Sequence, residues 1–147
     1  MERFNNVKHI ILYADDDYED VELLQQGLSP YTAIDLETFS NGRMLLSRIS
    51  QLTPKDPLPC LIILDIYMPL LNGWETLQRL RKIEWLNAIP ILLLTTSEME
   101  CDRLGTRNYN AHIVVKPSAS VERESLVDKI IAYCPEEVQQ QIRSVSS

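Results

Sequence analysis

The sequence has few cysteines and no excess of positive charge. Its three cysteines (Cys60, Cys101 and Cys134) are odd in number and include no CxxC pair, which disfavours both a disulfide framework and a zinc knuckle. Lys and Arg total 14 against 21 Asp and Glu, giving a net charge of −7. Binding to nucleic acid or to an anionic membrane needs clustered positive charge, so we expect neither.

Long apolar runs, repeats and low-complexity tracts are also absent. No stretch reaches the length of a membrane-spanning helix, and residues 1–6 lack the apolar stretch of a signal peptide. The chain has 147 residues, of which 45% are hydrophobic and 24% charged, as expected for one globular domain. We therefore expect a soluble, cytoplasmic protein with reduced, mostly buried thiols.

Short runs rich in Ile, Val and Leu recur along the chain and alternate with segments of helical periodicity. Such runs are typical of strands buried on both faces of a parallel sheet. The predicted strands are His9–Ala14, Ala33–Phe39, Cys60–Asp65, Ile89–Thr95 and Ile113–Val115. The predicted helices contain Val21, Leu24 and Leu28; Leu45, Ile49 and Leu52; Trp74, Leu77 and Leu80; and Leu126, Ile130 and Tyr133, with a weaker helix over Glu98–Asn108 that includes Leu104.

This alternation predicts an α/β fold in which right-handed crossovers place helices on both faces of one parallel sheet. Ligands of such folds bind beyond the carboxyl ends of the strands. Residues 135–147 are too few for an output domain, and we interpret them as a polar helical turn followed by a frayed end.

The end of the first strand is strongly acidic, since six of the eight residues from Asp15 to Glu22 are Asp or Glu. Carboxylates stabilise a helix start, and this explains Asp17 as a cap. It does not explain Asp15 and Asp16, which directly follow a buried run. Two adjacent like charges repel each other unless a cation neutralises them, so this pair indicates metal binding or a solvated helix start.

The ends of three further strands carry Asp65, Thr95 and Lys116. Taken alone, an Asp in this position is usually a cap or turn residue, and a Lys is usually surface. Together with Asp15 and Asp16 they form a set with a chemistry of its own. Carboxylate oxygens suit Mg²⁺, an Asp carboxylate can form an acyl phosphate, and an ammonium and a hydroxyl can neutralise a transferring phosphoryl group.

This set resembles the receiver domain of two-component response regulators. The resemblance rests on Asp15-Asp16, on Asp65 with Met68-Pro69 and Gly73, on Thr95, and on Lys116-Pro117. It covers residues 7–134, with 135–147 as a short extension. It implies the flavodoxin-like (CheY-like) doubly wound fold, with five parallel strands in the order 2-1-3-4-5.

The resemblance also implies a role for each matched residue. Asp65 is the phosphoacceptor, Thr95 hydrogen-bonds the phosphoryl group and Lys116 pairs with it. Mg²⁺ is held by Asp15, Asp16, Asp65 and the main-chain carbonyl of Tyr67. The Lys116–Pro117 peptide bond is cis.

The family further implies a signalling protein and not an enzyme, with only self-phosphorylation and self-dephosphorylation chemistry. The phosphoryl donor is a sensor histidine kinase or a histidine phosphotransfer protein. The output is contact with a downstream protein through the fourth helix, fifth strand and fifth helix. Many family members dimerise on activation, and homodimerisation stays open here.

Three positions depart from the family pattern. Ile113 occupies the place of an aromatic residue whose rotamer reports phosphorylation, and His112, which points to the other side of the strand, is a poor substitute. Thr96 is larger than the usual residue, and we hypothesise that it narrows the water path to the acyl phosphate. The ring of Tyr67 either shields the phosphoryl group or packs on its loop.

Three rival functions can be weighed against these residues. A Mg²⁺-dependent phosphatase with an Asp nucleophile needs a second Asp where Tyr67 stands. A flavodoxin-type FMN site needs a phosphate loop where Asp15-Asp16-Asp17 would repel the phosphate. A receiver fold used only as an unphosphorylated scaffold remains the main alternative, because of Ile113.

Overall fold

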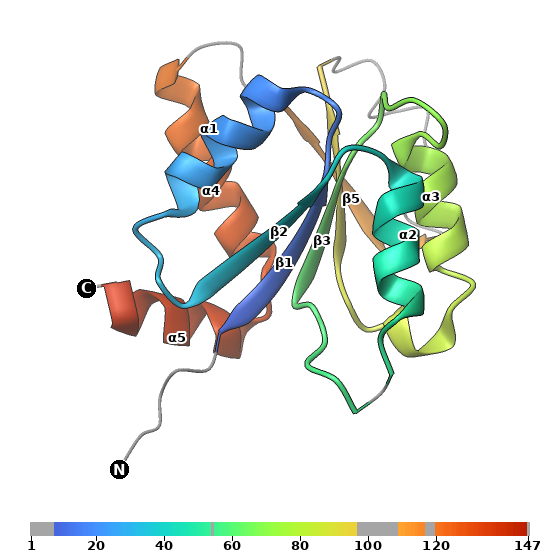
Figure 1. Ribbon diagram of the computed structural model, residues 1–147. Coiled ribbons are helices and arrows are strands. Elements are labelled where there is room, and N and C mark those ends of the chain that lie inside the picture. Colours follow the sequence, from blue (N-terminus) through green and yellow to red (C-terminus); the bar gives the residue numbers. More distant parts are fainter. Residues whose placement is uncertain (1–7, 54, 97–108, 117–119, 147) are drawn as a thin grey trace.

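The computed structural model describes residues 8–53, 55–96, 109–116 and 120–146, with side chains between 120 and 146 described only for residues 126–142. Its centre is one five-stranded parallel sheet in the order β2-β1-β3-β4-β5. The predicted strand order and the CheY-like α/β fold are thereby confirmed (Figure 1). The strands are β1 (His9–Ala14), β2 (Ile34–Phe39), β3 (Leu61–Asp65), β4 (Ile91–Thr95) and β5 (Ala111–Val115).

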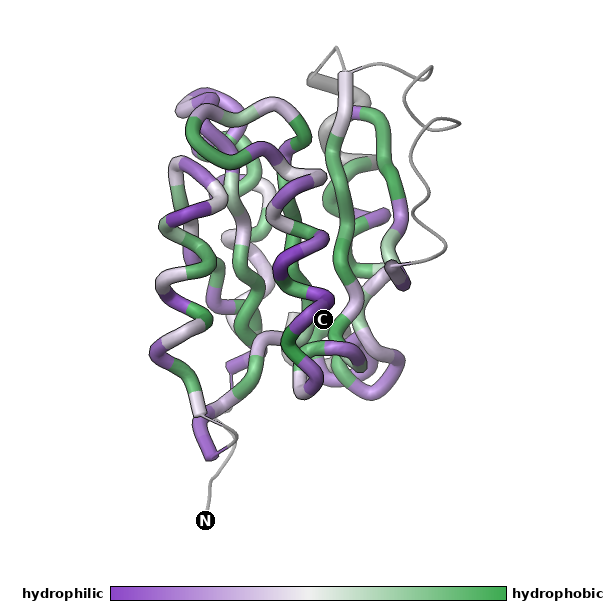
Figure 2. The backbone as a smooth tube through the Cα atoms, turned by 90° about the vertical axis from the view of Figure 1, so that its right-hand side faces the viewer, coloured by the Kyte–Doolittle hydropathy of each residue, from purple (hydrophilic) through white to green (hydrophobic). Residues whose placement is uncertain are grey.

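Helices cover both faces of the sheet. In Figure 1, α1, α4 and α5 lie on one side and α2 and α3 on the other. The helices are α1 (Tyr18–Leu28), α2 (Gly42–Ser50), α3 (Gly73–Leu80), α4 (Ser120–Tyr133) and α5 (Glu136–Ser146), with a short 3₁₀ helix, η1 (Glu84–Leu86), after α3. Hydrophobic and hydrophilic stretches alternate along the helices, as Figure 2 shows. None of the helices in the described part of the chain has both the length and the apolarity to cross a membrane.

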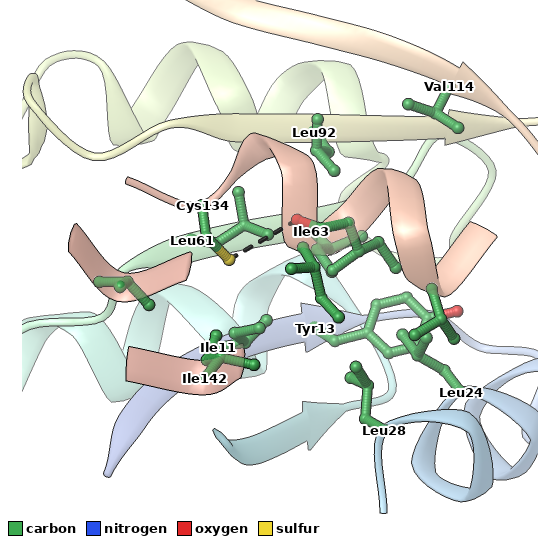
Figure 3. Close-up of a cluster of buried hydrophobic side chains, with 14 of the residues drawn as sticks. Ile11, Tyr13, Leu24, Leu28, Leu61, Ile63, Leu92, Val114, Cys134 and Ile142 are labelled. Carbon is green, nitrogen blue, oxygen red and sulfur yellow. Dashed lines mark hydrogen bonds between the residues drawn. The ribbon is translucent and has the colours of Figure 1, made fainter. Parts of the chain in front are cut away.

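Each face of the sheet has its own hydrophobic core, because successive side chains of a strand point to opposite faces. In β1, Ile11 and Tyr13 belong to the core under α1 and α4, which Figure 3 shows in close-up. Leu12 and Ala14 belong to the core under α2 and α3. The residues that follow β1 are thus held by a strand that is buried on both sides.

Three helices begin at side-chain caps, and the predicted cap of α1 by Asp17 is confirmed. The Asp17 carboxylate accepts hydrogen bonds from the main-chain N–H groups of Glu19 and Asp20 at the start of α1. Asn41 caps α2. At α3, Asn72 and Glu75 satisfy each other's main-chain N–H groups in a capping box.

Strand boundaries differ from the prediction by one or two residues. Ile89 was predicted to begin a strand, but β4 begins at Ile91 because Pro90 has no N–H to donate. Conversely, β5 begins at Ala111, two residues before the predicted Ile113. The apolar-run criterion missed this start because His112 is exposed and interrupts the run.

The C-terminal segment was wrongly predicted as a helical turn with a frayed end. It forms the 11-residue helix α5, in which Val138 and Ile142 are buried in the core beside α4. The side-chain amide of Gln139 donates to the carbonyls of Ala132 and Cys134 at the end of α4. Val138 and Ile142 are four residues apart, so they lie on one face of the helix and place that face on the core.

Arg81, directly after α3, fixes the entrance to β5. Its guanidinium donates to the carbonyl oxygens of Tyr109 at 2.6 Å and Asn110 at 3.0 Å, ahead of the strand. It also donates to the carbonyls of Leu86 at 2.8 Å and Ile89 at 2.6 Å. Burial lowers the pKa of this guanidinium. One side chain therefore ties the end of η1 to the start of β5.

Three predictions fall outside the described residues. These are the weak helix over Glu98–Asn108 with Leu104, the thiol of Cys101, and the cis Lys116–Pro117 bond. The other two cysteines form no disulfide: Cys134 is buried and Cys60 is partly buried. Reduced, mostly buried thiols were expected at both of these positions.

Candidate functional site

Four of the predicted site residues lie at one edge of the sheet. Asp15 directly follows β1, Asp65 ends β3, Thr95 ends β4 and Lys116 directly follows β5. The main-chain N–H of Lys116 donates to the carbonyl of Thr95 at 2.6 Å, so β4 and β5 stay paired up to this edge. The parallel topology thus brings together residues that are as much as 101 positions apart.

The carboxylates of Asp15, Asp16 and Asp65 form a compact acidic cluster. One oxygen from each lies within 4.8 Å of the others. Asp15 and Asp65 are buried, whereas Asp16 is exposed. Hard oxygen donors of one sign at this spacing fit a divalent cation such as Mg²⁺, which prefers oxygen ligands and keeps several waters.

The ammonium of Lys116 is the counter-charge of this cluster. It lies 2.9 Å from an oxygen of Asp15, 3.1 Å from Asp65 and 2.7 Å from Asp20 on α1. Burial alone would lower the pKa of Lys116. The hydrogen bonds to Asp20 and Asp15 and the nearby negative charges outweigh that effect and raise the pKa. Lys116 therefore carries its full positive charge at the site.

The pKa of Asp65 is also raised, but for Asp65 a raised pKa favours the neutral form. Burial and the neighbouring charge of Asp15 raise its pKa from 3.8 to about 7, although the Lys116 ammonium partly offsets both effects. One ammonium does not balance the three carboxylates that it contacts. A cation at this place would relieve the remaining repulsion.

Asp15 is held in place by two hydrogen bonds in addition to the one from Lys116, and together they leave its side chain little freedom. The hydroxyl of Tyr13 donates to Oδ2, the same oxygen that Lys116 contacts. The main-chain N–H of Asp17 donates to Oδ1 at 2.9 Å. Burial and the negative charge of Asp15 raise the pKa of Tyr13, so its hydroxyl keeps the proton that it donates.

The loop after β3 depends on Gly73 for its path. The N–H of Gly73 donates to the carbonyl of Ile66 at 2.9 Å, closing the loop against the strand. A Cβ at position 73 would lie 2.3 Å from the main-chain oxygen of Asp65. Any residue other than glycine would therefore have to move the backbone. The close approach fixes the end of β3.

Tyr67 and Leu70 lie on that loop with their side chains toward solvent. Tyr67 is 57% exposed and Leu70 is 70% exposed. The φ angle of Leu70 is 68°, in the left-handed region that non-glycine residues seldom adopt. Both interpretations of the Tyr67 ring, as a shield of the phosphoryl group or as packed on its loop, stay predictions.

The hydroxyl residues at the end of β4 differ in burial. Thr95 is fully buried at the last position of the strand, beside Lys116. Thr96, one residue later, is exposed. Of the two, only Thr95 is enclosed at the sheet edge that carries the acidic cluster.

An aliphatic side chain, that of Ile113, stands where the family usually has an aromatic residue. Ile113 is partly buried against the core under α2 and α3. His112 is exposed and points to the other face of the sheet, where its ring centroid lies 4.7 Å from that of Tyr133. The prediction that His112 points away from Ile113 is confirmed.

Sequence reasoning missed two residues of this site. Asp20 was explained as part of a solvated helix start, and Tyr13 as part of an apolar run. Tyr13 could have been found from its position, because residues two apart in a strand point to the same side and its hydroxyl could therefore reach Asp15. Asp20 gave no such signal, because its contact with Lys116 spans 96 positions.

The comparison with known families is consistent with this geometry. The model of the response regulator receiver domain matches residues 11–130. The chain belongs to this family. The acidic cluster of this receiver domain consists of the three Asp residues on which the resemblance rests.

Individual relatives of this receiver domain include proteins of other lengths. A transcriptional regulatory protein CpxR homolog from Haemophilus influenzae is 35% identical over 94 residues, covering 64% of this chain and 37% of that protein. Five curated relatives are matched over only 34% to 49% of their own length. The chain therefore spans half or less of each of these proteins.

Solved structures of similar chains match over most of their length. The Mn²⁺-bound form of response regulator Rcp1 is 26% identical with a TM-score of 0.71, covering 84% of this chain and 92% of that one. The bacteriophytochrome response regulator RtBRR is 24% identical with a TM-score of 0.72, covering 95% and 91%. The second likeness shows the shared fold.

Proposed function

We propose that this receiver domain is a phosphorylation switch in which Asp65 accepts the phosphoryl group. The observation that carries the proposal is the placement of the Asp65 carboxylate within the acidic cluster and 3.1 Å from the Lys116 ammonium. Carboxylates that could hold a divalent cation and an ammonium that could pair with a phosphoryl group are thus brought together around Asp65. The proposed unit is residues 7–134, with 135–147 as an extension.

The donor is proposed to be the phosphohistidine of a sensor histidine kinase or a histidine phosphotransfer protein. An oxygen of Asp65 forms a bond to phosphorus while the bond from phosphorus to the imidazole nitrogen breaks, and the released nitrogen takes up a proton. Lys116 neutralises charge on the phosphoryl oxygens, and Thr95 donates a hydrogen bond to one of them. Since phosphohistidine is made from ATP, the proposal places the switch in the cytoplasm.

Asp15, Asp16, Asp65 and the main-chain carbonyl of Tyr67 would hold the Mg²⁺ ion of this reaction. When bound, the ion would supply positive charge against the phosphoryl oxygens. The support is the oxygen-only donor set and the Mn²⁺-bound form of the similar Rcp1.

The output is proposed to be contact with a downstream protein. Engagement of Thr95 and Lys116 with a phosphoryl group would alter the packing at the ends of β4 and β5, and with it the surface that includes β5 and α4. The aliphatic Ile113 implies that this receiver passes the signal without a swinging aromatic ring. Homodimerisation through the same surface remains open, and the net charge of −7 disfavours nucleic acid as a partner.

Thr96 is proposed to prolong the life of the acyl phosphate. Its exposed side chain directly follows Thr95, where it would narrow the path of attacking water. We expect Thr96→Ala to lose phosphate faster after removal of the donor. An unchanged rate would contradict this role.

The central test is phosphorylation by a small donor. The full chain is incubated with Mg²⁺ and acetyl phosphate, and its intact mass is measured. We expect the wild type to gain the mass of one phosphoryl group and Asp65→Asn to gain none. Asp35→Asn, which removes an exposed carboxylate on β2, is the control and should be modified like the wild type. An unmodified wild type would favour the unphosphorylated scaffold, and modification of Asp65→Asn would exclude Asp65 as the acceptor.

A further inference from the structure

A cavity of about 350 Å³ lies between α1 and α4, next to the acidic cluster. Its walls are mainly apolar, with Leu23 and Leu24 from α1 and Leu126 from α4. Tyr13 forms part of its floor, and Figure 3 shows this ring beside Leu24. Ligand sites in proteins are typically cavities of this size with apolar walls and a few polar groups.

The two helices that frame the cavity, α1 and α4, contact each other. A Cβ at Gly27, which also lines the cavity, would lie 2.7 Å from a methyl carbon of Val127 on α4. The helices therefore touch at Gly27, and the open volume lies beside a fixed contact.

The polar groups of the cavity favour a positive ligand. Asp20, Asp128 and Lys116 line it, and Lys116 is the only Lys, Arg or His among the described lining residues. The ammonium of Lys116 already contacts the carboxylates of Asp15, Asp20 and Asp65. In the absence of a metal ion, the one positive charge of Lys116 among the carboxylates of Asp15, Asp20, Asp65 and Asp128 leaves this end of the cavity negative, which favours a cationic ligand over an anionic one.

We infer that this cavity binds a small amphipathic amine. Its apolar body would lie between Leu24 and Leu126, and its ammonium would pair with Asp20. The Asp20 carboxylate is 31% exposed at its side chain, so a ligand can reach it without displacing the buried Asp15. This binding does not require phosphorylation, and it goes beyond the proposed function.

A ligand on Asp20 would also affect Lys116, because the two ammonium groups share one carboxylate. Lys116 would lose one of its three carboxylate partners and would form a stronger ion pair with Asp65. Amine and phosphoryl group should then strengthen each other's binding by the same factor, since coupling between two sites is reciprocal. This second step, unlike the binding itself, rests on the proposed function.

The binding is tested with n-hexylamine, 1-hexanol and hexanoate, which share one apolar chain and differ in charge. Dissociation constants are measured by NMR titration of the full chain in metal-free buffer. We expect hexylamine to bind about tenfold more tightly than hexanol, as for a charge-assisted hydrogen bond, and hexanoate not to bind. Shifted resonances should come from α1 and α4.

Variants separate the charge from the cavity. Asp20→Asn should weaken hexylamine about tenfold and leave hexanol unchanged, whereas the exposed control Glu19→Gln should leave both unchanged. Leu126→Trp, which fills the cavity, should abolish the binding of both. Equal affinities for the three probes, an unaffected Asp20→Asn, or resonance shifts away from α1 and α4 would each overturn the inference.

The coupling is read separately with beryllofluoride, a stand-in for the phosphoryl group. Saturating hexylamine should tighten beryllofluoride binding several-fold in the wild type. If hexylamine binds but does not change beryllofluoride affinity, the coupling is wrong and the amine site stands. If beryllofluoride does not bind at all, it is the proposed function that fails.

Discussion

The ammonium of Lys116 lies 2.7 Å from a carboxylate oxygen of Asp20, closer than the 3.1 Å that separates it from Asp65. This contact joins the start of α1 to the end of β5 across 96 positions of sequence. Asp20 is not part of the acidic cluster formed by Asp15, Asp16 and Asp65. It therefore competes with the proposed phosphoacceptor for the positive charge of the site.

Removing this competitor should strengthen the binding of a phosphoryl group. In Asp20→Asn, Lys116 keeps its pairs with Asp15 and Asp65, and one negative charge that repels an anion is lost. We expect beryllofluoride to bind about threefold to tenfold more tightly, corresponding to about 0.7–1.4 kcal/mol. Titration followed by NMR measures this, with Glu19→Gln as a charge-matched control. Weaker binding in Asp20→Asn would show that Asp20 positions Lys116 and does not compete for it.

The raised pKa of Asp65 predicts how stability depends on pH in metal-free buffer. The folded protein holds the Asp65 proton up to a pKa of about 7, whereas the unfolded chain releases it near 3.8. Between these values the folded state binds more protons, so the contribution of Asp65 to stability declines as pH rises from about 4 to about 7 and levels off above.

This pH dependence should be smaller in Asp65→Asn, which has no proton to release. Urea unfolding midpoints at several pH values measure the difference, with Asp35→Asn as a control that removes an exposed carboxylate. Parallel pH profiles for the wild type and Asp65→Asn would contradict the raised pKa. Saturating Mg²⁺ should flatten the wild-type profile, because the ion stabilises the ionised carboxylate.

Two glycines allow a matched test of backbone crowding. In Gly73→Ala the new Cβ meets a main-chain oxygen at 2.3 Å, which cannot yield without moving the end of β3. We expect a loss of about 1–3 kcal/mol in the free energy of unfolding, together with weaker Mg²⁺ binding.

Gly27→Ala is the comparison. There the Cβ meets a side-chain methyl of Val127 at 2.7 Å, and alanine in a helix is favoured over glycine by about 1 kcal/mol. The two effects oppose each other, so its stability should stay within about 1 kcal/mol of the wild type. Equal losses in the two variants would show that the approach of Gly73 to Asp65 is not the dominant constraint.

The docking of α5 predicts a large effect from a residue near the C-terminus. Ile142 is fully buried in the core beside α4, so Ile142→Ala should lower the free energy of unfolding by about 2–5 kcal/mol. The exposed Gln140→Ala on the same helix should change it little. Urea denaturation of both variants checks this, and the same midpoint for both would mean that α5 adds nothing to the folded core.

The sequence alone determined the layered α/β architecture and most of the candidate site. The buried strand runs required a sheet covered on both faces, and the cap of α1 followed from Asp17. Parallel strands bring their carboxyl ends to one edge whatever the details of packing. For this reason Asp15 and Asp65 could be placed together before any distance was known.

Only the tertiary structure decided which side chains touch across that edge and what packs around it. Three sets of contacts join residues whose local sequence patterns do not predict one another. Lys116 pairs with Asp20, the Tyr13 hydroxyl donates to Asp15, and Arg81 binds four main-chain carbonyls. The docking of α5 likewise depends on the hydrophobic core beside α4, in which Val138 and Ile142 are buried. Local sequence sets the period and ends of an element, whereas its contacts depend on how the elements pack in space.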